Sequence, residues 1–400
     1  MPRKLHRNII AIYGLAFFHS FLVIVPVLVP FFASKGLSLA EIFYLQAIYA
    51  TTIVVLEAPS GFFADFFGRR AALLIGSMIH GLGYFILNFS DSLTTLVVFE
   101  VTLGAATSLL SGADLALLYD TQKALADEEN KEHSNGIANL GFIRSTAEGF
   151  GALLGGSLAM ISFDLMVLIQ SLSAWMCLLL ALVLVEPPVD QNDAHSRNLK
   201  LGGILRHMLV GDPLLRKLVL AIPLYNLMTF HVAWLIQPFW ESQGMPLALF
   251  GGLWCMQSIT TAIANKLGFR VERKHGAVFA LCLIGVLPIV SYFGLAWLQG
   301  WYGIGIGLLL FVCRGLNQVI LVNALNRRVP SSFRATANSL TSFLFRLSFI
   351  VTGPLIGMIA QSSGLESAML ILGGASIAVF IFVMMPLANA VKRTQRQLSH

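Results

Sequence analysis

The amino-acid sequence predicts an all-α membrane protein with twelve transmembrane helices in two six-helix bundles and both termini in the cytoplasm. Three observations predict this fold: the composition, a series of apolar runs, and the distribution of basic residues. Of 400 residues, 56% are apolar and 12% are charged, and the mean hydropathy is +0.78. About a quarter of the residues of a soluble domain are charged. The composition therefore excludes an ordinary soluble globular protein.

The apolar runs define the expected helices. A transmembrane helix needs roughly 20 mostly apolar residues. The sequence contains twelve such runs, at residues 8–33, 41–64, 71–90, 93–120, 136–162, 164–186, 216–243, 246–269, 277–298, 300–326, 334–361 and 364–390. The longest polar connection separates the sixth run from the seventh. We therefore expect an N-terminal bundle over 1–186, a cytoplasmic linker over 187–215 and a C-terminal bundle over 216–400.

Basic residues indicate the orientation. The loops on the side of the termini, with the two tails, hold 22 of the 26 lysines and arginines. The opposite loops hold only Lys35, and Arg144, Arg314 and Arg346 lie inside predicted spans. Cytoplasmic loops carry the excess of basic residues, so both termini are expected in the cytoplasm. The same asymmetry explains the net charge of +6 without a nucleic-acid partner.

The two halves share a pattern of residues at a period of six spans. The matching sets are Gly112, Asp114 and Asp120 with Gly315, Asn317 and Asn323, and Arg144 and Gly155 with Arg346 and Gly357. Span four thus matches span ten, and span five matches span eleven. Parallel halves of this kind are typical of transporters that hold substrate between the two repeats.

The decapeptide GFFADFFGRR lies between spans two and three, from Gly61 to Arg70. It resembles the signature loop of the major facilitator superfamily, G-x-x-x-D-x-x-G-R-R/K, at every specified position. Gly61 would let a helix approach closely, and Gly68 would permit a sharp turn. The resemblance implies a secondary transporter, similar to bacterial drug/proton antiporters and located in the bacterial inner (plasma) membrane.

The resemblance also implies a cytoplasmic latch between the halves. In the family, the acid at the position of Asp65 faces the positive end of span eleven. Arg69 or Arg70 would reach Asp120 at the end of span four. The competing interpretation is that the arginines only set the topology.

Span five carries a weaker match to an antiporter motif of the same superfamily. Gly151-Ala-Leu-Leu-Gly155-Gly156 resembles G-P-x-x-G-G, with alanine in place of proline. Small residues at this spacing also let membrane helices pack closely. Drug antiporters commonly have an arginine in span four, four residues before a glycine, whereas here Glu100 precedes Gly104. The resemblance favours export, but the proton role of that arginine does not transfer.

Ionisable residues inside spans are the main candidates for function, because each costs about 2.5–3.5 kcal/mol on insertion scales. Glu57 and Asp114 are the candidate proton carriers. The candidates for a substrate cavity or buried ion pairs are Glu100, Arg144, Glu148, Phe230, Trp234, Arg314, Asn317 and Arg346. Glu57 with Arg346 and Asp114 with Arg144 are possible pairs, and Arg144 with Glu148 is an alternative. Each acid could instead bind a cationic substrate or serve a structural ion pair.

Other side chains carry less information. Phe230 and Trp234 lie four residues apart inside a span and could line an apolar cavity, which favours an amphipathic substrate. His19, His80 and His231 are better explained as packing or interfacial residues than as residues that contact substrate. The four cysteines match neither a disulfide framework nor a zinc spacing, so we expect no metal.

Function follows by elimination. No nucleophile motif, phosphate loop or Cys/His cluster suggests an enzyme or an ATP-driven pump. A receptor or scaffold would not need so many buried charges, and two repeated halves argue against a channel. We therefore expect a monomeric carrier in the lipid bilayer that uses a proton gradient and no cofactor. Export of an amphipathic compound is the first hypothesis, and proton-coupled uptake of a nutrient, siderophore or lipid-like solute is the second.

Overall fold

A computed structural model describes residues 2–129, 136–187, 211–329 and 333–398 of the chain. The chain divides into two compact units. The first unit comprises Met1–Gln191 and Met245–Cys255, and the second comprises Asn192–Gly244 and Met256–His400. The predicted boundaries of the two bundles stay a prediction, because most of the linker lies outside the described residues.

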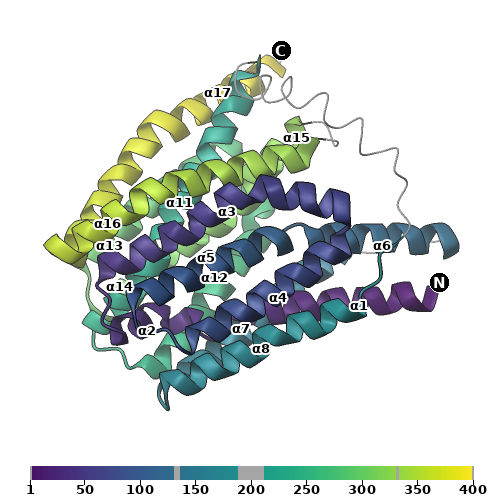
Figure 1. Cartoon of the computed structure of the whole chain (residues 1–400). Helices are drawn as coiled ribbons and strands as arrows, with labels where there is room; N and C mark the ends of the chain where they lie inside the picture. The colour runs from purple at the N-terminus through teal and green to yellow at the C-terminus, as the bar shows by residue number, and fades with distance from the viewer. Residues whose placement is uncertain (1, 130–135, 188–210, 330–332, 399–400) are drawn as a thin grey trace. The chain divides into compact units, whose positions relative to one another are not determined.

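The first unit consists of helices that lie side by side (Figure 1). They are α1 (Pro2–Ser20), η1 (Val25–Val27), α2 (Leu28–Ser34), α3 (Leu39–Phe67), α4 (Arg69–Leu87), α5 (Leu93–Leu110), α6 (Ala113–Glu129), α7 (Gly136–Ala159) and α8 (Phe163–Val183). Helix α4 packs against both α5 and α8, and α1 packs against α6, α7 and α8. Leucine, isoleucine and alanine side chains of α1, α4, α6 and α8 form its buried core.

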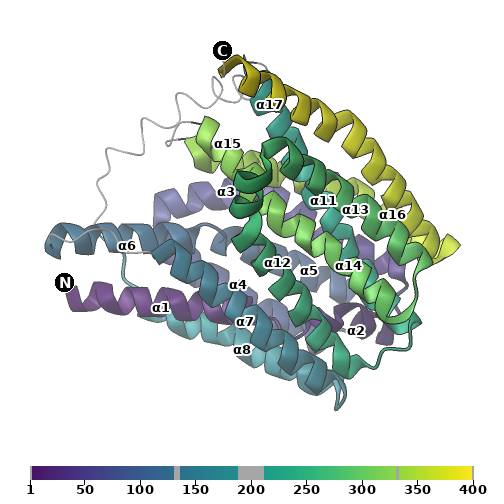
Figure 2. The same cartoon turned by 180° about the vertical axis from the view of Figure 1, so that it is seen from behind.

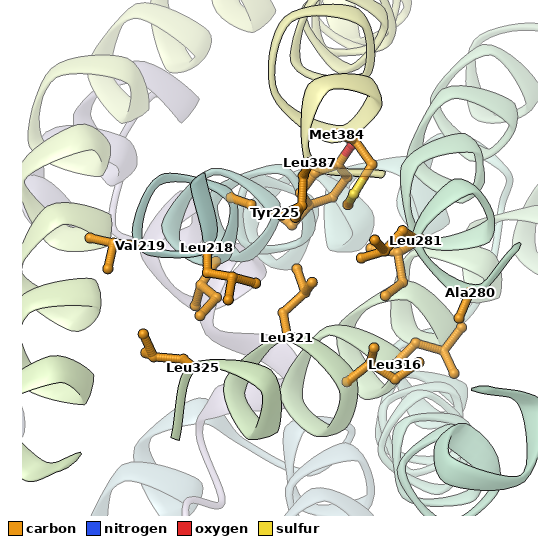
Figure 3. Packing of buried hydrophobic residues seen from close by; sticks show 14 of the residues in the cluster. Leu218, Val219, Tyr225, Ala280, Leu281, Leu316, Leu321, Leu325, Met384 and Leu387 are labelled. Atoms are coloured by element: carbon orange, nitrogen blue, oxygen red, sulfur yellow. The ribbon is translucent and has the colours of Figure 1, made fainter. Parts of the chain in front are cut away.

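The second unit is also helical (Figure 2). Its elements are α11 (Pro213–Ser242), α13 (Ala277–Trp297), α14 (Gly300–Leu316), η4 (Asn317–Leu321), α15 (Val322–Arg328), α16 (Arg334–Val379), η6 (Phe380–Met384) and α17 (Met385–Leu398). Helix α12 (Leu247–His275) begins in the first unit and ends in the second. Figure 3 shows the core of the second unit, where Leu218 and Tyr225 of α11 lie near Leu321, Met384 and Leu387.

Ten helices in the described part of the chain are long and apolar enough to cross a membrane. One of them, Thr336–Gln395, includes Gly364, whose φ of 88° and ψ of 163° are not helical. A side chain there would be strained, so glycine allows the chain to change direction at this point. The predicted boundary between the last two apolar runs falls at this residue.

The first predicted span, 8–33, lies almost entirely within one candidate membrane span, Lys4–Ser34, but it is not one continuous helix. The chain leaves α1 after Ser20 and resumes a short helical course at Val25. Gln170 of α8 compensates the break, because its Oε1 accepts hydrogen bonds from the backbone N–H groups of Val23 (2.6 Å) and Ile24 (3.4 Å). Backbone groups at membrane depth need such partners.

The fourth predicted span, 93–120, lies within one candidate membrane span, Leu93–Leu125, but its helix is also broken. It divides into α5 and α6 at Ser111 and Gly112, and Gly112 has a φ of 85°. Only glycine adopts this conformation without strain. The break places Asp114 in the first turn of a new helix.

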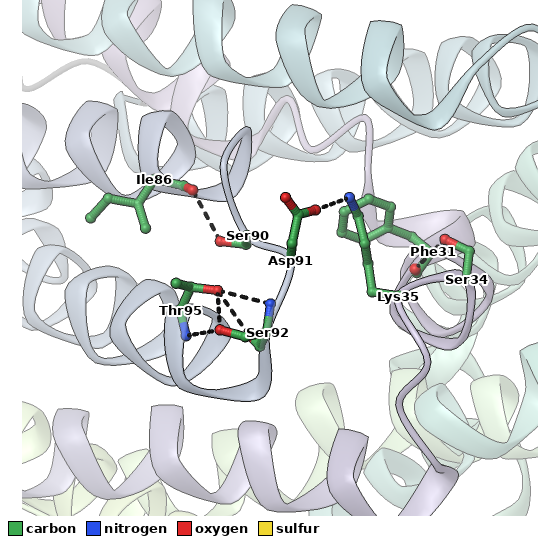
Figure 4. A network of polar contacts seen from close by, with 8 residues as sticks. All are labelled: Phe31, Ser34, Lys35, Ile86, Ser90, Asp91, Ser92 and Thr95. Carbon is green, nitrogen blue, oxygen red and sulfur yellow. Dashed lines mark hydrogen bonds and ion pairs between the residues drawn. The ribbon is translucent and has the colours of Figure 1, made fainter.

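The end of α2 and the turn between α4 and α5 are tied by one ion pair (Figure 4). Lys35 Nζ lies 3.0 Å from Asp91 Oδ1. Ser92 and Thr95 form a reciprocal cap that begins α5. Lys35 is the one basic residue that the sequence places opposite the termini, and the structure gives it a local acidic partner.

Candidate functional site

The loop between α3 and α4 has the geometry that its glycine predicts. Gly68 has a φ of 93° and a ψ of 152°, and it both ends α3 and begins α4. The predicted sharp turn is therefore confirmed. A Cβ at Gly61 would meet no described atom within 4 Å, so no helix of its own unit requires a glycine there.

Arg69 joins this loop to α6. Its guanidinium forms an ion pair with Asp120 and donates a second hydrogen bond to the carbonyl oxygen of Ala116, at 3.2 Å. The contact that the family resemblance implied is present. Both partners belong to the first unit, so this ion pair by itself fixes the loop to α6. Asp65 is exposed near the end of α3.

Glu186, which the sequence did not single out, completes the loop. Its carboxylate accepts hydrogen bonds from the backbone N–H groups of Arg69 (2.9 Å) and Arg70 (2.8 Å). These N–H groups are at the start of α4, where a helix lacks internal acceptors and favours negative charge. A Cβ at Gly68 would lie 3.2 Å from the Glu186 carboxylate, so glycine also makes room for this acid.

An ion pair between a buried carboxylate and a partly exposed arginine lies between α6 and α7. Arg144 donates to Asp114, whose side chain is 5% exposed. The other oxygen of Asp114 accepts the backbone N–H of Leu115 at 2.7 Å. The predicted contact between Asp114 and Arg144 is confirmed, and the alternative pairing of Arg144 with exposed Glu148 stays a prediction.

Glu100 occupies a different environment. It lies on α5, is 3% exposed, and accepts a hydrogen bond from Gln46 Nε2 at 2.9 Å. The position that holds an arginine in drug antiporters thus holds a buried acid beside an amide. Gly104, one turn later, lets α3 approach, because a Cβ there would lie 2.7 Å from Thr52.

The glycines of the degenerate antiporter motif have a structural explanation. A Cβ at Gly155 would lie 1.9 Å from the carbonyl oxygen of Val23, and one at Gly151 would lie 3.0 Å from the backbone nitrogen of Leu22. These two glycines accommodate the break after α1. Gly156 meets the backbone of Gly251 in the first turns of α12. Close backbone packing therefore accounts for all three positions.

The second unit contains the repeat-related polar residue Asn317. It is fully buried and donates to Asn226 Oδ1 at 2.8 Å. Asn317 begins the π-helical segment η4, so the repeat-related spans four and ten are both irregular near this position. Arg314 and Arg346 are half-buried on α14 and α16.

An aromatic cluster surrounds Phe230. Its ring lies edge-on to Phe349, Phe345 and Trp234, with centroids 4.9, 5.1 and 6.0 Å away. Trp234 is 8% exposed, and its indole N–H has no partner among the described residues. Edge-to-face contacts of this kind stabilise an apolar core. The predicted role of Phe230 and Trp234 in lining a substrate cavity stays a prediction.

Glu57 remains a candidate whose role stays a prediction. It is half-buried on α3, and its carbonyl oxygen accepts the hydroxyl of Ser60 at 3.1 Å. Pro59 lies inside the same helix and has no backbone N–H to donate to the preceding turn. Its predicted partner Arg346 belongs to the second unit, and their contact stays a prediction.

Comparison with known proteins agrees with this architecture. The Major Facilitator Superfamily matches residues 9–329. An uncharacterized MFS-type transporter of Bacillus subtilis, YxaM, is 22% identical over 367 residues, which cover 90% of this chain and 89% of YxaM. The quinolone resistance protein NorA of Staphylococcus aureus is 20% identical over 166 residues, which cover 42% of this chain and 41% of NorA.

Solved structures give the same fold. The nucleoside transporter NupG superposes with a TM-score of 0.76 at 15% identity, over 97% of this chain and 99% of NupG. A D-xylose-proton symporter superposes with a TM-score of 0.70 at 14% identity, over 96% and 97% of the two chains. Because the family match covers most of the sequence, this chain belongs to the Major Facilitator Superfamily of membrane transporters and is not an enzyme.

Proposed function

We propose that the protein exports an amphipathic small molecule in exchange for protons, by alternating access. Family membership supports transport of a small molecule. The partial likeness to NorA, a quinolone resistance protein, supports export. We propose that the aromatic side chains around Phe230 contact the apolar part of the substrate, because aromatic rings pack well against apolar groups.

The ion pair between Asp114 and Arg144 is the observation that carries the proposal. A proton on Asp114 removes one charge and leaves Arg144 without its counter-ion. A charged arginine at membrane depth then needs a new partner or water. Protonation of Asp114 therefore changes which helix arrangement is most stable, which is how a proton gradient can drive a conformational cycle.

Glu57 is the first candidate for the acid that couples proton binding to gating. It shares a helix face with Gly61 and Asp65, because the three residues are four apart. An arginine across the interface, Arg346, would hold its charged form while the cytoplasmic gate is closed. Asp114 is the second candidate. The repeat-related residue Asn317 cannot titrate, so the proton-carrying role of Asp114 would belong to the N-terminal half only.

We propose twelve membrane crossings with both termini in the cytoplasm. The ten candidate spans, the separate helix α7 and the division of α16 at Gly364 support that number. The proposed bundles are 1–186 and 216–400, joined by the linker 187–215. The bacterial relatives support a bacterial inner (plasma) membrane, and we propose a monomer with no cofactor.

Transport in proteoliposomes tests the proposal. An imposed proton gradient should drive accumulation of one or more fluorescent lipophilic cations from a panel that also contains nucleosides and pentoses. Asp114→Asn should abolish the gradient-driven component, whereas Asp164→Asn, which changes an exposed acid at the start of α8, should not. Gradient-driven uptake of a nucleoside or pentose alone would favour a symporter and overturn export.

A further inference from the structure

The interior of the first unit contains a line of titratable groups beyond the Asp114–Arg144 pair. His19 of α1 lies within electrostatic range of both Asp114 and Arg144. Its ring centroid is 5.0 Å from that of His80 of α4. His80 in turn lies 5.1 Å from the ring of Tyr84, one helical turn further along α4.

The line continues to Glu100. Tyr84 is 4% exposed and lies within electrostatic range of Glu100 and Tyr49, while α8 contributes Cys177 on another side. The ring of Tyr84 also lies edge-on to Phe99, at 5.7 Å between centroids. Glu100 is held by Gln46. Helices α1, α3, α4, α5, α6, α7 and α8 thus each contribute a titratable group to this line or to its neighbourhood.

His80 is the residue that packing does not explain. It is 3% exposed, and neither ring nitrogen has a hydrogen-bond partner among the described residues. The hydroxyl of Ser77, one turn away on the same face of α4, is also buried and has no hydrogen-bond partner among the described residues. An unsatisfied buried polar group costs about 1–3 kcal/mol, and an apolar side chain would fill the same space without that cost.

The second unit provides the contrast. His231 of α11 is also buried, but its Nδ1 lies 2.8 Å from the carbonyl oxygen of Leu227 and its Nε2 lies 3.1 Å from Thr352 Oγ1. Two hydrogen bonds fix that ring in one orientation. No such bond from a described residue holds His80, so a rotation of its ring would break none of the described hydrogen bonds.

We propose that His19, His80 and Tyr84 relay protons between Glu100 and the Asp114–Arg144 pair. This proposal rests on the proposed proton coupling and names the groups that carry the proton inside the first unit. Each imidazole accepts a proton on one nitrogen and releases one from the other. The Tyr84 hydroxyl accepts one proton and donates its own. Each transfer moves a single proton, and Arg144 keeps its charge throughout.

The chemistry of the two ends fits a relay. A carboxyl group buried beside an amide is least costly to bury when it carries its proton. Glu100 is therefore suited to hold the proton at one end. Asp114, with an arginine as partner, is suited to receive it at the other, since its protonation frees Arg144 to find a new partner.

Deuterium exchange followed by infrared spectroscopy tests the relay without a transported substrate. The full chain is reconstituted in lipid vesicles and the buffer is changed to D₂O. A protonated carboxyl group gives a carbonyl stretching band in the infrared spectrum. The band that is present in the wild type and missing in Glu100→Gln belongs to Glu100. Its downshift measures how fast the buried proton exchanges with water.

His80→Gln and Tyr84→Phe should each slow this exchange at least about tenfold, because each removes one proton-transferring group. Tyr84→Phe keeps the ring contacts, so it decides the outcome if His80→Gln folds poorly. His231→Gln is the matched control and should exchange at the wild-type rate.

Three results would overturn the relay: no carboxyl band that depends on Glu100, wild-type exchange in Tyr84→Phe, or equal slowing in His231→Gln. The transport assay with lipophilic cations tests the proposed proton coupling separately from the relay. If exchange slows in the relay variants while no gradient-driven transport occurs in the wild type, the relay stands and the proposed coupling fails.

Discussion

The carboxylate of Glu186 accepts the backbone N–H of Arg69 at 2.9 Å, 117 residues earlier in the chain. The same carboxylate accepts the N–H of Arg70. An acid three residues beyond the end of α8 therefore caps α4. The backbone of the signature loop is thus held in part by a residue outside its own motif.

Glu186→Ala should destabilise the protein by about 1 kcal/mol, the usual loss on removing a helix cap. Glu186→Gln should lose less, since its amide oxygen still accepts one hydrogen bond. Thermal unfolding in detergent measures both variants. Glu366→Ala, which changes an exposed acid of α16, is the control and should unfold as the wild type does. An unchanged midpoint for Glu186→Ala would show that the cap is dispensable.

Asp65→Asn and Arg69→Ala should shift the protein toward the inward-open state and reduce transport while leaving expression largely intact. Arg69 positions the loop through Asp120, and Asp65 is the exposed acid left to engage the other half. Thiol-accessibility labelling on both faces measures the shift. Asp91→Asn, at the opposite side of the first unit, should leave the labelling unchanged. Wild-type labelling in both latch variants would refute the latch.

Glu57→Gln should abolish proton-driven transport but retain substrate binding and exchange. A carrier acid that cannot titrate stops the coupled cycle, whereas exchange needs no net proton movement. Gradient-driven accumulation and counterflow of the same lipophilic cation, measured in parallel, separate the two activities. If Glu57→Gln accumulates substrate normally against a gradient, Glu57 is a structural partner, and Asp114 is the remaining candidate.

Gly155→Ala should destabilise the first unit by about 1–3 kcal/mol, the usual cost of overpacking. The added Cβ would lie 1.9 Å from the carbonyl oxygen of Val23, where the break after α1 leaves no space. Gly149→Ala on the same helix is the matched control, because nothing lies within 4 Å of its Cβ position. Equal unfolding midpoints for the two variants would contradict the close packing of α7 on the break.

A membrane-impermeant thiol reagent should label Ser363→Cys from outside the cell and Gln395→Cys only after permeabilisation. The two positions flank the last predicted span, and both are exposed. The four native cysteines are first replaced, although Cys177 and Cys313 are already buried. Labelling of both positions from the same side would contradict the orientation that the basic residues predict.

Part of the candidate site could be predicted from the sequence because its evidence is local. Gly68 predicted a turn. Asp114 and Arg144 lie at a similar predicted depth in the membrane on neighbouring spans, which favoured their pairing. Glu186 and Gln170 were missed because their partners lie more than 100 residues away. A signal existed for Gln170: a lone amide in an apolar span needs a polar partner. The sequence does not indicate which one.

The sequence by itself determined that the chain crosses a membrane many times, because hydropathy and span length depend on each segment alone. It also determined the family, since the decapeptide from Gly61 to Arg70 is contiguous. Only the tertiary structure decided where spans break. The breaks near Val23 and Gly112 depend on Gln170, on Gly151 and Gly155, and on the positive φ of Gly112. It also decided that His80 packs between His19 and Tyr84 with no hydrogen bond to a described residue, whereas His231 is bonded on both nitrogens. Whether a buried side chain has a hydrogen-bond partner depends on which helices lie beside it. That arrangement is set by tertiary packing.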